Sequence, residues 1–414
     1  MWARRSPISL PARAATAAPT CSLPRALRRF SSTLDPAGGD FGPPAGSVQM
    51  RTRASLRSPE ASLGAAMTAA EEFSALTGQF RGELVAHCYR MLGSADEAED
   101  LVQETYLRAW RSYERFENRS SLRTWLYRIA TNACLTAIER RGRRPLPSGL
   151  GGPGDDPEGP VTAAPEVPWL QPIPDALLAA GPADPAAITA SRAGIRLAMV
   201  AAMQYLSARQ RAVLILRDVL DWPAAEVAGL LGTTTTAVNS ALRRARAQMA
   251  QALPAEDEVA EPAEAEQRAQ LDRFAAAFEN ADMGALTALL RDEVVLEMPP
   301  VLTWFSGRDA VERFMASHLL TAPGAFRMEA VTANGQPALA AYHRGDDGAY
   351  HAHAVVVPAI TTTGISRIVI FIQPGLFAGF DLPQVHGATA AGPAPAHEQV
   401  NSGGSHVPRH PPGS

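Results

Sequence analysis

Lysine is absent from this chain of 414 residues, so all 38 basic side chains are arginine. This bias reflects a GC-rich coding sequence and carries no information about the fold. No apolar run reaches the roughly eighteen residues of a membrane-spanning helix, so we expect no membrane contact. Hydrophobic residues make up 46% and charged residues 19%, which excludes a wholly disordered chain. The net charge of −4 neither requires nor excludes a nucleic-acid partner, so the positions of the charges matter more.

Cysteine is also scarce. The three cysteines, Cys21, Cys88 and Cys134, are far apart and form no C-x-x-C motif. This pattern argues against a disulfide framework and against a zinc site. We therefore expect no metal and no cofactor, and we expect Cys88 and Cys134 to be small buried side chains in a reducing cytoplasm.

The two ends of the chain have biased compositions. Residues 1–66 contain nine arginines but only three acidic residues, with much Pro, Ser, Ala and Gly. An Arg-rich, acid-poor segment is typical of a transit peptide. A disordered extension, or a start codon placed too far upstream, explains it equally well, and we favour these explanations. Residues 386–414 are rich in Gly, Pro and His, and we expect them to be disordered as well.

Residues 67–144 have the periodicity of a small helical domain. Gly93 breaks the pattern, Ser94 is a good N-cap, and Glu97 would complete a capping box. Ser120 or Ser121 can cap a further helix that runs to about residue 141. The apolar positions recur every three or four residues, which predicts that they face a core: Leu84, Cys88, Met91, Leu92, Leu101, Tyr106, Leu107 and Trp110.

A second helical domain is predicted over residues 188–253. It lies between a Pro/Gly/Ala-rich segment, 145–187, which we interpret as a flexible linker, and an acidic linker at 254–267. Pro223 fits the first turn of a short helix, and Gly232 supplies a tight turn before the next helix. The inner stripe of that last helix would be Val238, Leu242, Ala245 and Met249. This spacing indicates a helix-turn-helix.

Short hydrogen-bonding side chains begin the last of these helices, where a recognition helix meets base edges: Thr234, Thr235, Thr236, Asn239 and Ser240. Arg243, Arg244 and Arg246 follow and could neutralise phosphates. Residues 190–253 hold eight arginines against three acidic residues, a local net charge of +5. The alternative is a pair of helices with a solvated arginine face.

The first helical domain allows a more specific interpretation. Residues 96–110, DEAEDLVQETYLRAW, and 122–132, LRTWLYRIATN, closely resemble regions 2.2 and 2.3–2.4 of extracytoplasmic-function (ECF) sigma factors. The second domain then resembles region 4, in the right order. Residues 233–242, TTTTAVNSAL, resemble the SigG-like subgroup, which carries an extra C-terminal domain. The resemblance implies a multidomain protein that binds core RNA polymerase and promoter DNA and initiates transcription.

The resemblance also implies which residues act. The acidic helix would bind the polymerase β′ clamp, while region 4 would face the β flap; an anti-sigma factor is a further possible partner. The implied polymerase-binding residues are Asp96, Glu99, Asp100, Gln103, Glu104 and Arg108. Those implied for the −10 element are Asn118, Arg119, Ser120, Arg123, Trp125, Arg128 and Asn132. Trp125 fits the core equally well. The −35 element would be read by Thr234, Thr235, Thr236, Asn239, Ser240, Arg243 and Arg244.

Residues 268–385 change character to α+β. Two short helices, 268–280 and 283–290, precede a strand at 293–298; a helix at 309–319 precedes strands near 326–331, 338–342, 351–358 and 365–372. This segment resembles the SnoaL-like branch of the NTF2-like cones, some of which are cyclases or isomerases. The fold expected for the whole chain is therefore two all-α domains, which resemble sigma regions 2 and 4, plus a C-terminal α+β NTF2-like cone.

The histidines of this last domain are candidates for a ligand pocket. His351 and His353 are two residues apart on a predicted strand and so would share a face. The full set is Trp304, His318, His343, His351 and His353. No carboxylate stands at a metal-binding spacing, so we expect no metal site here. We expect a regulatory module with no catalytic residues, which could bind the polymerase, contact the linker or sense a small apolar ligand. Two rival hypotheses remain: a conventional helix-turn-helix regulator, and a SnoaL-type cyclase or isomerase with a DNA-binding appendage.

Overall fold

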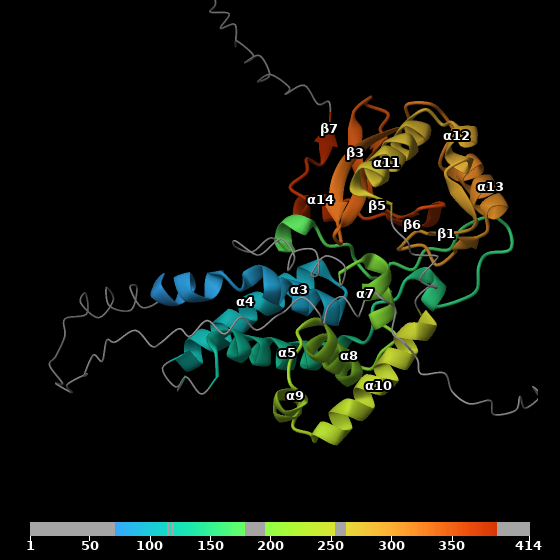
Figure 1. Cartoon of the computed structure of the whole chain (residues 1–414). Helices are drawn as coiled ribbons and strands as arrows, with labels where there is room; N and C mark the ends of the chain where they lie inside the picture. The colour runs from blue at the N-terminus through green and yellow to red at the C-terminus, as the bar shows by residue number, and fades with distance from the viewer. Residues whose placement is uncertain (1–70, 114–115, 117–119, 179–194, 253–261, 387–414) are drawn as a thin grey trace, which may run out of the picture.

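The structure, a computed structural model, describes residues 71–113, 116, 120–178, 195–252 and 262–386. Two helical units lie beneath an α+β domain (Figure 1). The first helical unit contains α3 (Arg81–Leu92), α4 (Ala95–Ser112) and α5 (Leu122–Arg141). The second contains α7 (Leu197–Met203), α8 (Ala208–Leu214), the π-helical turn η4 (Ile215–Val219), α9 (Ala224–Leu231) and α10 (Thr235–Ala252).

The first unit begins and ends its helices largely where the sequence predicts. Gly93 ends α3 in the left-handed region at φ 73°, and the Ser94 hydroxyl accepts a hydrogen bond from the Glu97 amide. The predicted capping box is only half formed, because the Glu97 carboxylate pairs with two arginines, Arg141 and Arg144, instead of the Ser94 amide. Ser121, one of the two predicted caps, accepts from the Thr124 amide at 3.0 Å.

Two predicted core positions of α4 are wrong. Leu107 is 56% exposed and Trp110 is 38% exposed, whereas the buried side of the helix holds Ala98, Val102 and Ala109. Small residues form the buried stripe because α3 and α5 both pack closely on α4. The prediction from periodicity gave too much weight to the large apolar side chains, so the predicted buried face of α4 differs from the observed one.

The second unit is a helix-turn-helix with its caps in place. Ser207 and Gln210 form a complete capping box at the start of α8. Pro223 is the N-cap of α9, one position before the predicted first turn, and Gly232 ends that helix at φ 60°. The buried residues of α10 are the four predicted: Val238, Leu242, Ala245 and Met249.

The C-terminal domain is a curved seven-stranded sheet around three helices. The strands are β1 (Leu290–Glu297), β2 (Phe305–Ser306), β3 (Phe326–Ala333), β4 (Gln336–Arg344), β5 (Tyr350–Thr361), β6 (Gly364–Phe371) and β7 (Val385–His386). Their order is β2-β1-β6-β5-β4-β3, with β7 on β5, and β1 and β6 run parallel while the other pairs are antiparallel. The remaining helices are α11 (Glu264–Glu279), α12 (Met283–Thr287), α13 (Arg308–His318) and α14 (Leu376–Gly379).

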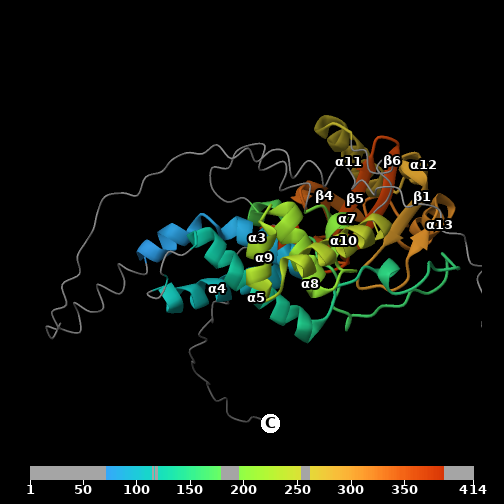
Figure 2. The same cartoon turned by 60° about the horizontal axis from the view of Figure 1, so that its bottom comes forward.

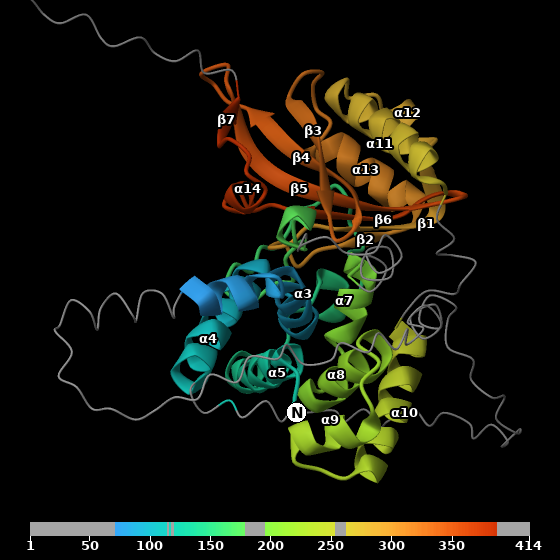
Figure 3. The same ribbon diagram turned by 60° about the vertical axis from the view of Figure 1, so that its left-hand side comes forward.

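The two faces of this sheet belong to different cores. Helices α11, α12 and α13 cover the concave face, and the other face is turned toward α3 and α7 (Figure 3). Along β5, Val356 belongs to the concave core, whereas Val355 and Val357 belong to a core that continues into both helical units. This alternation follows from the two-residue period of a strand. The outer face of the sheet therefore closes the hydrophobic core that all three units share.

The segment between the helical units is not the free tether that we expected. Over residues 145–178 it has only the short 3-10 turns η2 (Pro147–Gly149) and η3 (Asp175–Leu178), as a lack of periodicity predicts. Yet Trp169, Leu170 and Ile173 are at most 3% exposed. These apolar side chains, set in a Pro/Gly-rich stretch, bury against neighbouring units and hold the segment in place. Figure 2 shows it passing along the side of β1 and α13.

Backbone hydrogen bonds fix this linker to both neighbours. The Ala164 amide donates to the Pro300 carbonyl and the Leu302 amide to the Thr162 carbonyl, beside β1. At the other end, the Gln171 amide donates to the Gly93 carbonyl at 2.9 Å. A Cβ on Gly93 would lie 2.7 Å from Leu170, so this position needs glycine for its close approach as well as for its φ.

Asn334 joins four segments of the chain. It occupies, with Gly335, the two-residue turn between β3 and β4, where both φ angles are positive. Its buried amide group donates to the Tyr89 hydroxyl of α3 and to the Ile195 carbonyl, and its side-chain oxygen accepts from the Ile173 amide. Burial raises the pKa of Tyr89 well above its usual value, so its hydroxyl remains neutral. The α+β domain is thereby bonded to both helical units and the linker.

Candidate DNA and polymerase surfaces

One face of α4 is polar and open to solvent. Asp96, Asp100 and Gln103 are exposed, and the exposed Leu107 extends the same stripe by one more turn. The other predicted polymerase-binding residues have partners within the chain: Glu99 pairs with Arg81, and Glu104 with Arg108 at 2.7 Å. Asp96 also accepts from the side-chain amide of Gln171, in the linker, at 3.1 Å. Exposed pairs of this kind are weak, so a partner protein can displace them at little cost.

The helix α5 carries the predicted −10 residues, and the structure divides them. Asn118 and Arg119 lie outside the described residues. Ser120 is half-buried, directly before the cap. Arg128 and Asn132 are exposed and one helical turn apart, so they share a face. This pair is the part of the predicted surface that α5 presents to solvent.

Other side chains of α5 are engaged by neighbours. The Arg123 guanidinium donates to Glu83 at 2.7 Å and lies over the Tyr127 ring at 5.0 Å. Trp125 is half-buried and stacks on Phe116, with ring centroids 4.7 Å apart. The stack leaves part of the indole exposed to solvent. The position of Trp125 is thus intermediate between a core residue and a DNA-facing one, the two roles that the sequence allows.

A buried polar contact lies beneath α5. His87 of α3 is fully buried, and its Nε2 is 3.0 Å from the Thr131 hydroxyl. Burial, with the nearby Arg90 and Arg123, lowers the pKa of His87 to about 3. The imidazole is therefore neutral at pH 7, and its edge meets the Tyr127 ring. The pairing of α3 with α5 depends on this uncharged histidine.

The predicted −35 residues lie at the start of α10 and along the helix. Thr234 caps α10 by accepting from the Ala237 amide at 3.2 Å. Ser240 is half-buried, and the other residues of the set are exposed at the start and along one side of the helix: Thr234, Thr235, Thr236, Asn239, Arg243 and Arg244. Because the opposite side is the buried stripe, their direction is set by the core.

Two arginines of the second unit, one of them predicted to neutralise phosphates, are engaged within the protein. Arg246 forms two hydrogen bonds with Asp218, at 2.9 and 2.6 Å, so its charge is already neutralised within the unit. Arg211 is 1% exposed and binds the Met91 carbonyl at the end of α3, together with oxygens of Gln204 and Leu206. The local charge of +5 therefore overstates what faces solvent.

Arg211 instead joins the two helical units. The Met91 carbonyl is among the last four of α3, which have no hydrogen-bond partner inside the helix. A cation there donates hydrogen bonds to the carbonyl and interacts favourably with the negative end of the helix dipole. Burial lowers the pKa of Arg211 to about 10, which leaves it charged at pH 7. This role could not be predicted from the sequence, because an arginine at the start of a helix-turn-helix is ordinarily solvated.

The second unit also lies close to the exposed face of α5. The Trp222 ring, before α9, meets Tyr127 at 6.0 Å between centroids. A Cβ on Gly229 of α9 would lie 4.0 Å from the Arg128 guanidinium. In this arrangement α9 stands beside the polar side chains that α5 presents.

The five candidate pocket residues of the α+β domain do not line one pocket. His343 and His353 are near each other, 5.7 Å between ring centroids, and both contact Phe326. The others turn elsewhere. Trp304 donates to the Gly151 carbonyl of the linker, His318 stacks on Phe314, and His351 pairs with Asp347 at 3.0 Å. The prediction fails because a bulge between β4 and β5 separates the two histidines of the strand, and because the concave face is filled by its own aromatic core.

Each of the three domains of this chain is similar to a known protein family. Models of sigma-70 region 2, of sigma-70 region 4 and of the SnoaL-like domain match residues 76–144, 196–249 and 271–367. The ECF RNA polymerase sigma factor SigG of Mycobacterium tuberculosis is 49% identical over 314 residues, which cover 75% of this chain and 84% of that protein. The chain belongs to the ECF family of RNA polymerase sigma factors. It is a sigma factor that binds core RNA polymerase and directs it to promoters.

Other relatives share the same order of domains or part of it. The ECF sigma factor SigJ of M. tuberculosis is 29% identical over 311 residues, covering 70% of this chain and 86% of that one. Its crystal structure matches with a TM-score of 0.47 and 24% identity, over 76% of this chain and all of that one. SigW of Bacillus subtilis is 37% identical over 71 residues, covering 17% of this chain and 38% of that protein.

Family membership decides between two of the hypotheses raised by the sequence. Because the region 2 model covers α3, α4 and α5, this sigma factor is not a conventional helix-turn-helix regulator. Within the described residues, no helix is long and apolar enough to cross a bilayer. The contacts that sequence reasoning missed are those between domains: Arg211, Asn334 and Glu297. A tryptophan and two aliphatic residues inside a Pro-rich segment, Trp169, Leu170 and Ile173, were the one signal that the linker is packed.

Proposed function

We propose that this sigma factor divides promoter recognition between two helices. The first half of α10 reads −35 duplex DNA, with Asn239 near base edges and Arg243 on phosphate. The exposed face of α5 holds the opened −10 strand through Arg128 and Asn132. The observation that supports this division is that each helix buries one face completely and presents polar side chains on the other.

We also propose that α4 is the polymerase-binding helix, through the stripe Asp96, Asp100, Gln103 and Leu107. Three polar side chains followed by an exposed leucine suit a protein partner better than DNA, because two carboxylates would repel phosphate. The partner would be the polymerase clamp, in the cytoplasm.

A pair of charge reversals tests the polymerase surface. Asp100→Arg should weaken binding to core polymerase at least tenfold, because it places a cation in the centre of the acidic stripe. Glu264→Arg is the matched control, because Glu264 is an exposed acidic residue on α11, far from α4. It should leave binding within twofold. Equal effects of the two changes would contradict the assignment of α4.

A double substitution tests the −10 surface. The variant Arg128→Ala/Asn132→Ala should retain binding to core enzyme and to −35 duplex DNA but lose run-off transcription. Permanganate reactivity of unpaired thymines at −10 would fall with it. A variant that opens the promoter like the unchanged protein would show that α5 reads DNA with other residues.

The α+β domain, we propose, is a non-catalytic regulator that acts through the linker. Among the candidate histidines, His351 pairs with a carboxylate, that of Asp347, but both side chains are exposed, whereas the acid–base pair of a SnoaL-type isomerase must line an enclosed substrate site. In addition, Asn334 bonds the domain directly to both sigma regions. Asn334→Ala should change promoter output while leaving binding to core enzyme measurable. Unchanged output from a folded variant would contradict regulation through this junction.

A further inference from the structure

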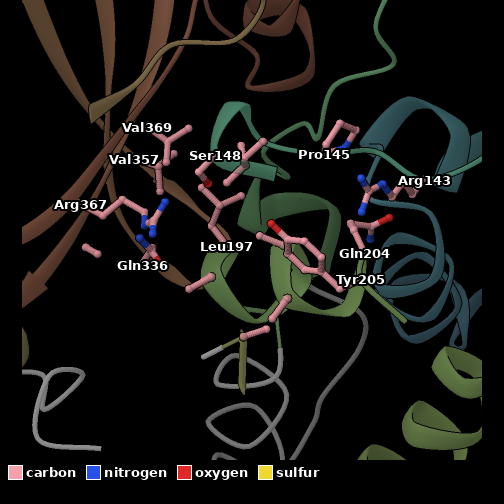
Figure 4. Close-up of a pocket in the computed structure, with 16 residues that line it drawn as sticks. Arg143, Pro145, Ser148, Leu197, Gln204, Tyr205, Gln336, Val357, Arg367 and Val369 are labelled. Carbon is pink, nitrogen blue, oxygen red and sulfur yellow. The ribbon is translucent and has the colours of Figure 1, made fainter. Parts of the chain in front are cut away.

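A cavity of about 150 Å³ lies where the α+β domain, the linker and region 4 meet (Figure 4). Its walls come from β4, β5 and β6, from α7, and from the residues that follow α5. The residues that line it and enter the argument are Arg143, Leu197, Tyr205, Gln336, Val357 and Arg367. It is therefore formed by three units that are distant in sequence.

This cavity is on the outer face of the sheet, away from the filled concave side. Val357 and Val369 line it, and both belong to the core shared with the helical units. Their neighbours along the strands, Val356 and Ile368, point into the concave core instead. None of the five histidine and tryptophan candidates contributes to its wall.

Part of the cavity wall is aliphatic, and the cavity has the size of a small ring. Leu197 and the two valines belong to this part, with the valines beside Arg367 (Figure 4). An engineered apolar cavity of about 150 Å³ in another protein binds benzene, so a ligand with a body of roughly six to nine heavy atoms fits. A wall of aliphatic side chains favours an apolar body over a sugar or a nucleotide.

Polar groups stand at both ends. Arg367 and Gln336 lie side by side at one end, and Arg143 lies over the Tyr205 ring, 5.6 Å from its centroid, at the other (Figure 4). Arg367 pairs with the fully buried Glu297, whose other oxygen accepts from the Ser148 amide at 2.9 Å. A guanidinium has five donors, so this pair leaves Arg367 donors for a ligand.

The charges of the cavity suit a single negative charge. Arg143 and Arg367 contribute two positive charges, and Glu297 neutralises one of them. Arg143 has no carboxylate partner among the described residues. The cavity as a whole therefore keeps one positive charge, that of Arg143 at one end. At the other end, the donors that Arg367 has left match the two oxygens of a planar carboxylate.

We propose that this cavity is a binding site for a small aromatic or branched aliphatic monocarboxylate. The carboxylate lies on Arg367 and Gln336, and the apolar body lies between Leu197 and Val357. Because the walls come from the linker, region 4 and the α+β domain, the ligand binds only while these units are packed together. Its binding therefore favours the packed arrangement over any arrangement in which they separate.

Benzoate is a suitable probe, and benzyl alcohol is its uncharged counterpart. Titration of the full chain, followed by calorimetry or by saturation-transfer NMR, should show saturable benzoate binding at one site and at least tenfold weaker binding of benzyl alcohol. Arg367→Gln should weaken benzoate binding at least tenfold. Arg313→Gln, a change of the same kind in an exposed pair on α13, should leave it within twofold.

A second variant keeps the test valid if Arg367→Gln disturbs the buried Glu297. Ala201→Leu adds three carbons to the α7 wall without touching any charge, and it should abolish benzoate binding while leaving the melting temperature near that of the unchanged chain. No saturation up to about 10 mM benzoate would overturn the proposal. So would binding that persists in both Ala201→Leu and Arg367→Gln, because the anion would then lie elsewhere.

Discussion

The helices α5 and α10 are the two proposed to read DNA, and they differ in how much of their polar surface the chain itself uses. On α10 the threonines, Asn239 and Arg243 extend into solvent, above a buried stripe that is wholly apolar. On α5, Arg123 is paired with Glu83, Trp125 stacks on Phe116, and Arg128 lies near α9. The helix α10 therefore presents nearly its whole polar surface to solvent. The helix α5 leaves Arg128 and Asn132 exposed but commits Arg123 and Trp125 to contacts within the chain.

This difference agrees with the tasks of the two elements. Duplex DNA at −35 needs no conformational change, so a preformed surface binds it at least cost. A melted strand at −10 is formed only after the polymerase is bound, and a surface engaged within the free protein is released by the same event. On the proposed division of roles, the contacts of α5 with region 4 would link access to the −10 surface to separation of the two sigma regions.

The largest expected effect comes from removing the contact that joins the regions. Arg211→Met removes a buried guanidinium that donates to the Met91, Gln204 and Leu206 carbonyls and to the Gln204 side chain. Each buried polar group left without a partner costs about 1–3 kcal/mol, so we expect a loss of about 3 kcal/mol in the free energy of unfolding. Urea titration measures it.

Arg243→Met is the control for this change, because Arg243 is exposed on α10. It should alter the free energy of unfolding by less than about 0.5 kcal/mol. A loss in Arg211→Met no larger than in this control would mean that region 4 is not anchored on α3, and the contrast between α5 and α10 would lose its basis.

The sequence predicted the elements well and their mutual contacts poorly. Caps at Ser94, Ser121 and Ser207 are local, because the side chain and the amide it accepts from are three residues apart. The buried stripe of α10 was predictable for a similar reason, because its residues are three or four positions apart in one helix.

Contacts between domains have no such local signature. Asn334 reads as an ordinary turn residue, and Arg211 as an ordinary surface cation, until residues more than a hundred positions away are brought beside them. The cavity beside Arg367 could not be predicted from the sequence for the same reason. Its three walls come from segments whose separation in the sequence hides their proximity.

The second prediction concerns the buried face of α5, which includes a polar contact between Thr131 and His87, whereas the buried stripe of α10 is wholly apolar. The pKa of His87 is about 3 in the folded chain and about 6.5 when unfolded, so the folded form binds fewer protons in acid. Its contribution to stability is complete above pH 6.5 and is lost as the pH falls from there toward 3. At pH 5 the loss is about 2 kcal/mol.

Urea titrations at pH 7 and pH 5 measure this effect. His87→Gln removes the titrating group, so its free energy of unfolding should fall by about 2 kcal/mol less between the two pH values than that of the unchanged chain. His351→Gln removes an exposed histidine and should keep the full fall. Identical pH dependence in all three proteins would show that His87 titrates normally and that α5 does not rest on a neutral histidine.

The smallest expected effect separates the arginines of α10. Arg243→Ala should weaken −35 duplex binding and lower the slope of log K against log salt by about 0.9, because one phosphate contact releases about one counterion. Arg246→Ala should leave that slope unchanged, since Arg246 is held by Asp218. Its effect should appear as a modest loss of stability, because the Asp218 carboxylate, 7% exposed, loses its partner. Fluorescence anisotropy at several salt concentrations gives both slopes. An equal decrease for the two variants would mean that the Asp218 pair opens on DNA, and α10 would then resemble α5 in giving up internal contacts to bind.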